Sequence, residues 1–222
     1  MSLNVDEYFQ EYEKLAAGVD TVFASVVGRF PEQVTCRTGC SSCCHALFDL
    51  FLVEALYLNR KFVELSRERQ VEILKRADFA DRKAYKLKRE LARRARNGES
   101  PSDILQYAAE LRIRCPLLDD DQRCALYDFR PLTCRLYGIP VNIEGSSHTC
   151  GLSAFEAGGA YPAVQLEKIQ TRLQQISSAL AEGLGSRYSE LGQMLVPVSS
   201  ALLTDYSPEY LGLVAEREEG AE

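Results

Sequence analysis

Residues 36–44 read CRTGCSSCC, and the rest of the chain is organised around this stretch. It places four thiols within nine residues, at Cys36, Cys40, Cys43 and Cys44. Core packing does not require such a density of sulfur. Thiolates bind soft and borderline metal ions, and a Cys-x2-Cys spacing lets one short turn present two sulfurs to one ion. The stretch therefore predicts a metal site.

Four further cysteines follow much later in the chain. They reach the first four only through tertiary folding, so metal binding would tie distant segments together and contribute to the free energy of folding. Eight thiolates suffice for two tetrahedral four-sulfur zinc sites, or for one iron–sulfur cluster with thiols to spare. We predict that all eight are metal ligands: Cys36, Cys40, Cys43, Cys44, Cys115, Cys124, Cys134 and Cys150.

Other uses of the cysteines compete with this interpretation. Buried free cysteines behave as small hydrophobes, which does not explain four of them in nine residues. Disulfides require an oxidising compartment, and the sequence shows no export signal. A catalytic thiol with a histidine base stays open, although no single Cys–His pair stands out. As ligands, we rank His45 and His148 below every cysteine.

Composition and charge narrow the class of protein. The chain has 222 residues, enough to bury a core without help from a metal. Its formal net charge of −6 argues against nucleic-acid binding over the whole surface. The longest apolar run, near residues 50–53, is too short to span a bilayer. We expect a cytoplasmic protein with no membrane association.

Helical periodicity predicts a mainly α fold, a helical bundle around the cysteine-rich site. We expect a single domain over residues 1–222, with a core at 36–150, an N-terminal helix at 4–28 and C-terminal helices at 162–215. An Asn4-x-x-Glu7 capping box is expected to open the first helix.

The last long helix is expected to start at Pro162. Its apolar seam of Leu166, Ile169, Leu173, Ile176 and Leu180 is short for a coiled coil, which favours packing within the chain. A homodimer or another protein partner stays open.

Residues 46–58 are apolar on nearly every side, with Asp49 and Glu54 as the only charges. This pattern predicts a central buried helix that begins at the paired cysteines and carries the cluster on its N-terminus. Buried carboxylates need partners, for which Arg130 and Arg135 are candidates.

Residues 66–97 predict a long charged helix with a narrow stripe of mostly small apolar residues. Its basic run is interpreted as a solvated helix face rather than a patch for RNA, an acidic partner or an anionic substrate. Residues 115–127 predict a small β-hairpin with an acidic turn and a cysteine on each arm. Asp128 is expected to cap a short helix with Pro131 in its first turn, and residues 139–143 predict a short strand.

Several motifs together resemble a known family. The pattern Cys36-x3-Cys40-x2-Cys43-Cys44, then Cys115-Pro116, then Cys124-x2-Tyr127-x2-Arg130-Pro131-x2-Cys134-Arg135 is similar to that of the YkgJ-type cysteine-cluster family of zinc- or iron-chelating domains. The resemblance covers residues 36–150 and implies zinc, iron or iron–sulfur binding through these cysteines. A similar cluster occurs in flagellin lysine N-methylases, which implies protein modification as the enzymatic alternative.

Two functions follow as hypotheses. In the first, the cysteines hold zinc, mainly as a structural element. In the second, they hold iron or an iron–sulfur cluster in a redox or protein-modifying enzyme, next to a pocket lined by Tyr127, Arg130, Arg135 and Tyr137. The spacing at Cys36, Cys40 and Cys43 also matches the radical-SAM cluster motif, but the aromatic residue usual before its third cysteine is replaced by Ser42.

Overall fold

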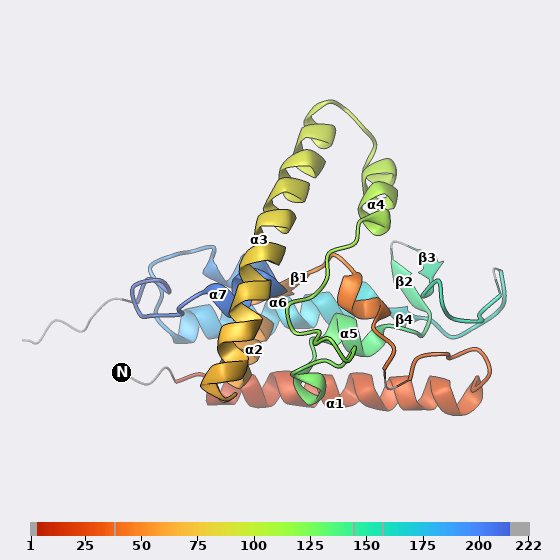
Figure 1. Cartoon of the computed structure of the whole chain (residues 1–222), viewed down its shortest axis with the longest axis horizontal. Helices are drawn as coiled ribbons and strands as arrows, with labels where there is room; N and C mark the ends of the chain where they lie inside the picture. Colours follow the sequence, from red (N-terminus) through yellow and green to blue (C-terminus); the bar gives the residue numbers. More distant parts are fainter. Residues whose placement is uncertain (1–3, 38, 144, 157, 214–222) are drawn as a thin grey trace, which may run out of the picture.

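Two long helices frame the molecule, one along its base and one rising away from it (Figure 1). The structure is a computed structural model that describes residues 4–213 except 38, 144 and 157, and omits the side chains of residues 105 and 109. The described part is mainly helical with small strand pairs, which confirms the predicted fold class. None of the helices in this part is both long enough and apolar enough to cross a membrane.

The described residues form seven α-helices and three short 3-10 helices. The α-helices are α1 (Asp6–Arg29), α2 (Leu52–Val63), α3 (Arg67–Arg96), α4 (Pro101–Glu110), α5 (Leu132–Leu136), α6 (Leu166–Gly183) and α7 (Val198–Leu203). The 3-10 helices are η1 (Ser42–His45), η2 (Tyr127–Phe129) and η3 (Leu191–Gln193).

The strands are short and form two small sheets. In the first, β1 (Asp49–Phe51) pairs antiparallel with β5 (Leu195–Pro197). In the second, β2 (Val141–Ile143) lies between β3 (Ser146–His148), which is antiparallel to it, and β4 (Val164–Gln165), which is parallel. Only β2 was predicted, because strands of two or three residues carry too little alternation to be recognised from sequence.

The N-terminal helix is confirmed as α1, but its predicted capping box is wrong. The N-cap residue is Val5, and no side chain caps it. The acidic residues Asp6 and Glu7 occupy the first turn, where the helix dipole favours negative charge. The inward face of α1 packs against α5 and α6. Its buried residues are Phe9, Tyr12, Ala16, Val19 and Val26.

The central apolar helix is confirmed as buried, whereas its predicted start is wrong. All seven residues from 52 to 58 are buried in α2. The cysteines, however, end in η1, and the strand β1 separates them from α2. Pairing with β5 satisfies the extended backbone of residues 49–51, so the helix starts only at Leu52. The dipole of α2 therefore does not point at the paired cysteines.

Glu54 is buried and Asp49 only half-buried, and both have partners other than the predicted arginines. Glu54 accepts hydrogen bonds from the backbone N–H of Leu132 at 2.9 Å and of Phe51 at 3.4 Å. Asp49 pairs with Lys88 on α3, at 2.7 Å. The orphan N–H groups at the starts of α5 and α2 need acceptors, and Glu54 supplies one to each. It thereby joins the two helices.

Burial makes Glu54 a pH-dependent element of stability. Loss of hydration raises the pKa of its carboxyl from 4.5 to about 7, against the opposing effects of the two backbone N–H groups and Arg135. Because the folded state binds the proton more tightly, stability falls as pH rises from 4.5 to about 7 and is then constant. Glu54→Gln should remove that decline, so its free energy of unfolding relative to wild type should rise by roughly 3 kcal/mol across the window.

Denaturant titrations at several pH values measure this difference, with Glu68→Gln as the same substitution at an exposed position. Burial places the pKa of Tyr12 well above its ordinary value, so this neighbour does not titrate in the window. Parallel stability profiles for Glu54→Gln and wild type would refute this role.

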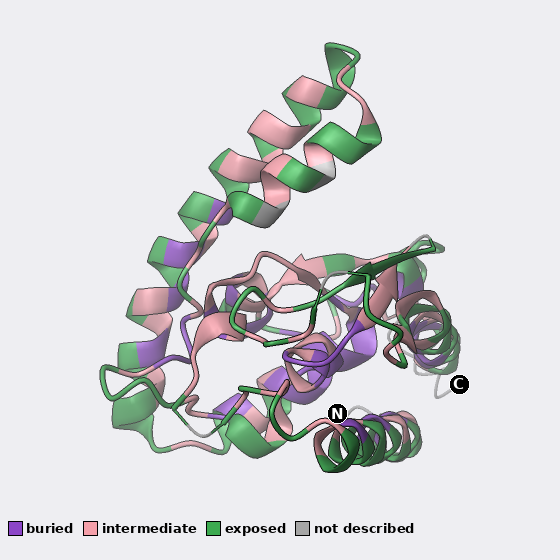
Figure 2. Ribbon diagram, turned by 90° about the vertical axis from the view of Figure 1, so that its right-hand side faces the viewer, coloured by how far each residue is buried: buried purple, intermediate pink, exposed green. Residues whose placement is uncertain are grey.

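The predicted charged helix is confirmed as α3, capped by the Ser66 hydroxyl, which accepts from the N–H of Arg69. Ile73, Ala77, Ala80 and Ala84 are buried, while the outer half of α3 and the antiparallel α4 project beyond the body as an arm (Figures 1 and 2).

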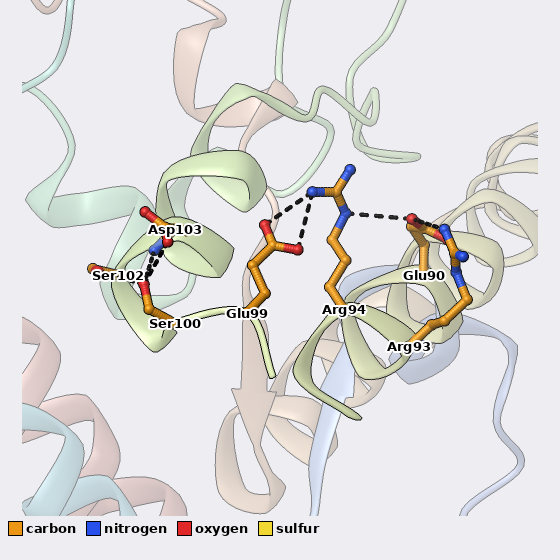
Figure 3. Close-up of polar contacts among 7 residues, drawn as sticks. All are labelled: Glu90, Arg93, Arg94, Glu99, Ser100, Ser102 and Asp103. Carbon is orange, nitrogen blue, oxygen red and sulfur yellow. Dashed lines mark hydrogen bonds and ion pairs between the residues drawn. The ribbon is translucent and has the colours of Figure 1, made fainter. Parts of the chain in front are cut away.

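Ion pairs at the tip of this arm link the end of α3 to the segment that leads into α4. Arg94 bridges Glu90 and Glu99, Arg93 also pairs with Glu90, and the Ser100 hydroxyl caps α4 (Figure 3). Several cations of the basic run are thus engaged within the arm itself, which agrees with its interpretation as a solvated face.

The predicted β-hairpin at 115–127 is reduced to a single antiparallel bridge between Leu118 and Cys124. The N–H groups of Asp119 and Ala125 close it on the carbonyls of Arg123 and Leu117. The next helix is confirmed as α5, but Pro131, not Asp128, precedes it as the N-cap residue.

The predicted seam of α6 is buried at Leu173, Ile176 and Leu180 and packs on α1 and α2. Packing within the chain is thereby confirmed. The predicted start of this helix at Pro162 is wrong, because residues 164 and 165 form β4 and α6 begins at Leu166. Helix α7 is the last described helix, and residues 214 and 215 of the predicted range lie outside the described residues.

Candidate metal centre

Seven of the eight cysteines line one cavity, of about 350 Å³. They are Cys36, Cys40, Cys43, Cys44, Cys115, Cys124 and Cys134. The eighth, Cys150, is not in this lining, but its thiol lies 3.8 Å from the hydroxyl of Ser42, beside Cys43. All eight are free thiols. The predicted convergence of distant cysteines is therefore present in the fold.

Short backbone contacts bring these segments together. Gly39 takes a left-handed φ of 89°, which turns the chain between the first two cysteines. The N–H of Cys115 donates to the carbonyl of Cys44 at 2.7 Å, so the two segments lie edge to edge. The bridge at Leu118 folds Cys124 back toward Cys115. Helix α5 then presents Cys134.

Cys43 is the centre of the thiol contacts. Hydrogen bonds from Cys134 and then Cys44 lower the pKa of the Cys43 thiol well below its ordinary value. The same two bonds raise the pKa values of Cys134 and Cys44, which hold the shared protons. Burial raises the pKa of Cys115 to about 12. Of these thiols, Cys43 is thus the one whose thiolate form its neighbours favour.

Four arginines share the cavity with the thiols: Arg37, Arg114, Arg123 and Arg130. Burial raises the pKa values of Cys36 and Cys124, and the positive charge of Arg130 opposes that rise. The same charge adds to the hydrogen bonds that lower the pKa of Cys43. Its guanidinium stacks on the ring of Tyr127 at 3.7 Å, and its buried Nε has no hydrogen-bond partner among the described residues. Arg130 therefore places a positive charge where it offsets the charge of thiolates.

Of the four residues predicted to line a pocket, Tyr127 and Arg130 line this cavity, and the other two do not. Arg135 instead pairs with Asp20 and donates to the carbonyls of Arg130 and Asp128, which turns it away from the thiols. His45 bonds the carbonyl of Ser41 and, like His148, is absent from the cavity lining.

Sequence reasoning missed Arg37, Arg114 and Arg123. Each directly adjoins a cysteine in the chain, and this was the signal available: an arginine placed next to a thiol ligand is carried to the same site. The adjacency is not sufficient, because Arg135 also adjoins a cysteine and points elsewhere.

The donor set tests which ion fits. The described lining contains no Asp, Glu or His, so the cavity offers sulfur alone as a charged ligand. Sulfur-only sites suit zinc and iron–sulfur clusters and disfavour magnesium and calcium, which take oxygen ligands. As the described side chains stand, no group of three or more Cys, His, Asp or Glu is arranged to hold an ion. The residue types fit zinc or iron, and binding requires the thiols to draw together.

Gly138 fixes the position of Cys36. Its φ is 102°, and a Cβ added there would lie 2.7 Å from the Cβ of Cys36. Gly138→Ala should cost about 1–2 kcal/mol for the left-handed backbone and roughly 1–3 kcal/mol more for the clash. Gly98→Ala isolates the first effect, since φ there is 82° and nothing lies within 4 Å of the added atom.

Denaturant unfolding of both variants measures the two costs, and metal content shows whether Cys36 has moved. Gly138→Ala should be the less stable variant and the one with reduced metal. An equal loss of stability in the two variants would show that Cys36 can shift away from the added methyl group at no cost.

A mainly helical body that gathers distant thiols around one cavity defines a cysteine-cluster protein. The chain belongs to the CxxCxxCC family, whose description is "Putative zinc- or iron-chelating domain" and whose model matches residues 35–151. The match contains all eight cysteines and confirms the resemblance predicted from their spacing. No curated protein and no solved structure matches the chain.

Proposed function

We propose that this protein binds zinc through its cysteine thiolates, and that the metal joins the loop at residues 36–44 to the segments that carry the later cysteines. The convergence of seven cysteines on one cavity supports the proposal most directly. The adjacent arginines support it too, because they offset the charge of several thiolates held together. When bound, zinc supplies a tetrahedral crosslink between segments that have few other contacts.

The electrostatic neighbours of each thiol suggest two groups. Cys36 lies close enough to Cys40, Cys43 and Cys150 to feel their charges, so we assign these four to one ion. Cys44 and Cys134 both feel Cys115 and Cys124, so we assign these four to a second ion. The Cys43 thiol also contacts Cys44 and Cys134 of the second group, so we place it at the boundary between the two ions.

The compartment follows from the same chemistry. Thiols bind metal only while reduced, and a reducing cytoplasm keeps them so. We therefore retain the cytoplasm as the proposed location.

An iron or iron–sulfur enzyme is the second candidate. One observation favours it: the cavity extends past the thiols to helices α3 and α7, which leaves room beside the metal for another molecule. In that case Arg130, with its unpaired Nε, is the residue placed to orient a bound group.

Elemental analysis and a visible spectrum of protein purified without oxygen test these functions. The zinc proposal expects a colourless protein with about two zinc ions per chain, as two four-sulfur sites require. Cys36→Ser and Cys124→Ser should each lose one ion, from different groups. Iron with acid-labile sulfide, in place of zinc, would favour the second candidate over the zinc proposal. A protein that retains neither metal would overturn both.

A further inference from the structure

The cavity is larger than its sulfur wall requires. At about 350 Å³ it lies within the range of roughly 300–1,000 Å³ typical of small-molecule sites. Beside the thiols, the lining includes residues contributed by α3, β5 and α7.

The apolar part of the lining comes from segments far apart in the sequence. We call it the apolar wall: Leu47, Phe48, Ala80, Ala84, Ile113 and Val198. Leu47, Phe48, Ile113 and Val198 are only half-buried, because they face the cavity. Partly exposed apolar side chains that meet in a hollow mark a binding site more often than a packing defect.

Two alanines create the space. Ala80 and Ala84 lie one turn apart on α3, are each 4% exposed, and line the cavity. Ala77, one turn earlier, is fully buried but does not line it. The same stripe of small residues therefore allows close packing at Ala77 and leaves space for the cavity at Ala84.

We propose that the apolar wall binds a small, neutral, mostly apolar molecule directly beside the thiol cluster. The site has no carboxylate or histidine in its described lining, and its arginines stand among the thiols, whose charge they offset. A charged body would lose its hydration at the apolar wall without gaining a partner. The inference deepens the proposed function, on which it rests for the metal at the sulfur wall.

A series of straight-chain alcohols from 1-butanol to 1-octanol probes the wall, because these molecules have no particular affinity for zinc or iron. Calorimetry should show saturable binding to the metal-loaded protein. Affinity should rise about threefold to fourfold per added methylene until the room is filled, and then level off.

Two variants of the apolar wall should change, in opposite directions, the alcohol chain length at which the affinity levels off. Ala84→Leu should make the affinity level off at a shorter alcohol, and Ile113→Ala at a longer one. Ala77→Leu is the matched control: it over-packs the core and lowers stability, but should not shift the preferred chain length in protein that remains folded by circular dichroism. Because Ile113→Ala adds no bulk, it tests the wall even if Ala84→Leu fails to fold.

The absence of saturable binding to wild type, or a preferred length that is the same in Ile113→Ala and wild type, would overturn the inference. Binding only after the metal is removed would also overturn it, since the alcohol would then occupy the space of the metal. Metal content measured on the same samples separates the proposals. If the purified protein holds metal but binds no alcohol, only the apolar site is contradicted. If the purified protein holds no metal but binds alcohol, only the metal site is contradicted.

Discussion

Cys43→Ser is expected to abolish one metal site and to weaken the other, with an affinity loss of about 100-fold or more for the ion it ligates. Cys43 is the thiol that contacts both Cys44 and Cys134, and it lies between the two proposed groups. Loss of an outer-shell partner already costs roughly 10–100-fold in metal affinity, so loss of a ligand should cost at least as much. Serine has nearly the same size, so the change removes a ligand and leaves the packing.

Competition titration with a coloured chelator measures this affinity. His45→Ala is the matched control, because it changes a neighbouring residue able to bind metal that nevertheless does not line the cavity. It should leave the affinity unchanged. Wild-type affinity in Cys43→Ser, or an equal loss in His45→Ala, would remove Cys43 from the ligand set.

Removal of the metal is expected to lower the thermal midpoint of the wild-type protein by on the order of 10 °C. An ion present at about 1,000 times its dissociation constant stabilises the folded state by roughly 4 kcal/mol. In a chain of this size each kilocalorie shifts the midpoint by about 2–4 °C. Thermal unfolding with and without a strong chelator measures the shift, and added zinc should reverse it.

The chain should stay helical without metal, since the core formed by α1, α2 and α6 contains none of the eight cysteines. The loss should therefore concentrate at the loop of residues 36–44 and the segment after Arg114, where hydrogen exchange should increase most. Metal-free protein with an unchanged midpoint would show that the ion contributes nothing to the fold.

Much of this architecture could be predicted from the sequence, for a physical reason. Long helices repeat their burial pattern many times, so α1, α3 and α6 are recognisable from their apolar stripes. Their ends are harder: the first-turn signal at Asn4 and Glu7 is as good as many true caps, yet α1 begins at Asp6. Local propensity does not decide between two adjacent starts.

The start of α2 shows what sequence cannot supply. Nothing near Asp49 indicates a strand, because β1 exists only through its pairing with β5, almost 150 residues later. The partners of Glu54 are equally hidden, since backbone N–H groups carry no sequence signal. The arginine partners were inferred from charge alone, and the chain instead used helix starts that needed acceptors.

The site divides in the same way. The thiols were identified from their spacing, and seven of them share one cavity. The apolar wall was not foreseen, because its members come from segments whose meeting depends on how α3 and α7 pack. The small residues of α3 were visible as a stripe, but only the structure shows which of them face a cavity.

X-ray absorption at the edge of the bound metal tests the central claim most directly, because it reports which atoms surround the ion. For the wild-type protein prepared without oxygen, the expected result is a shell of four sulfurs at about 2.3 Å from zinc. A shell dominated by nitrogen or oxygen at about 2.0 Å would contradict ligation by these cysteines.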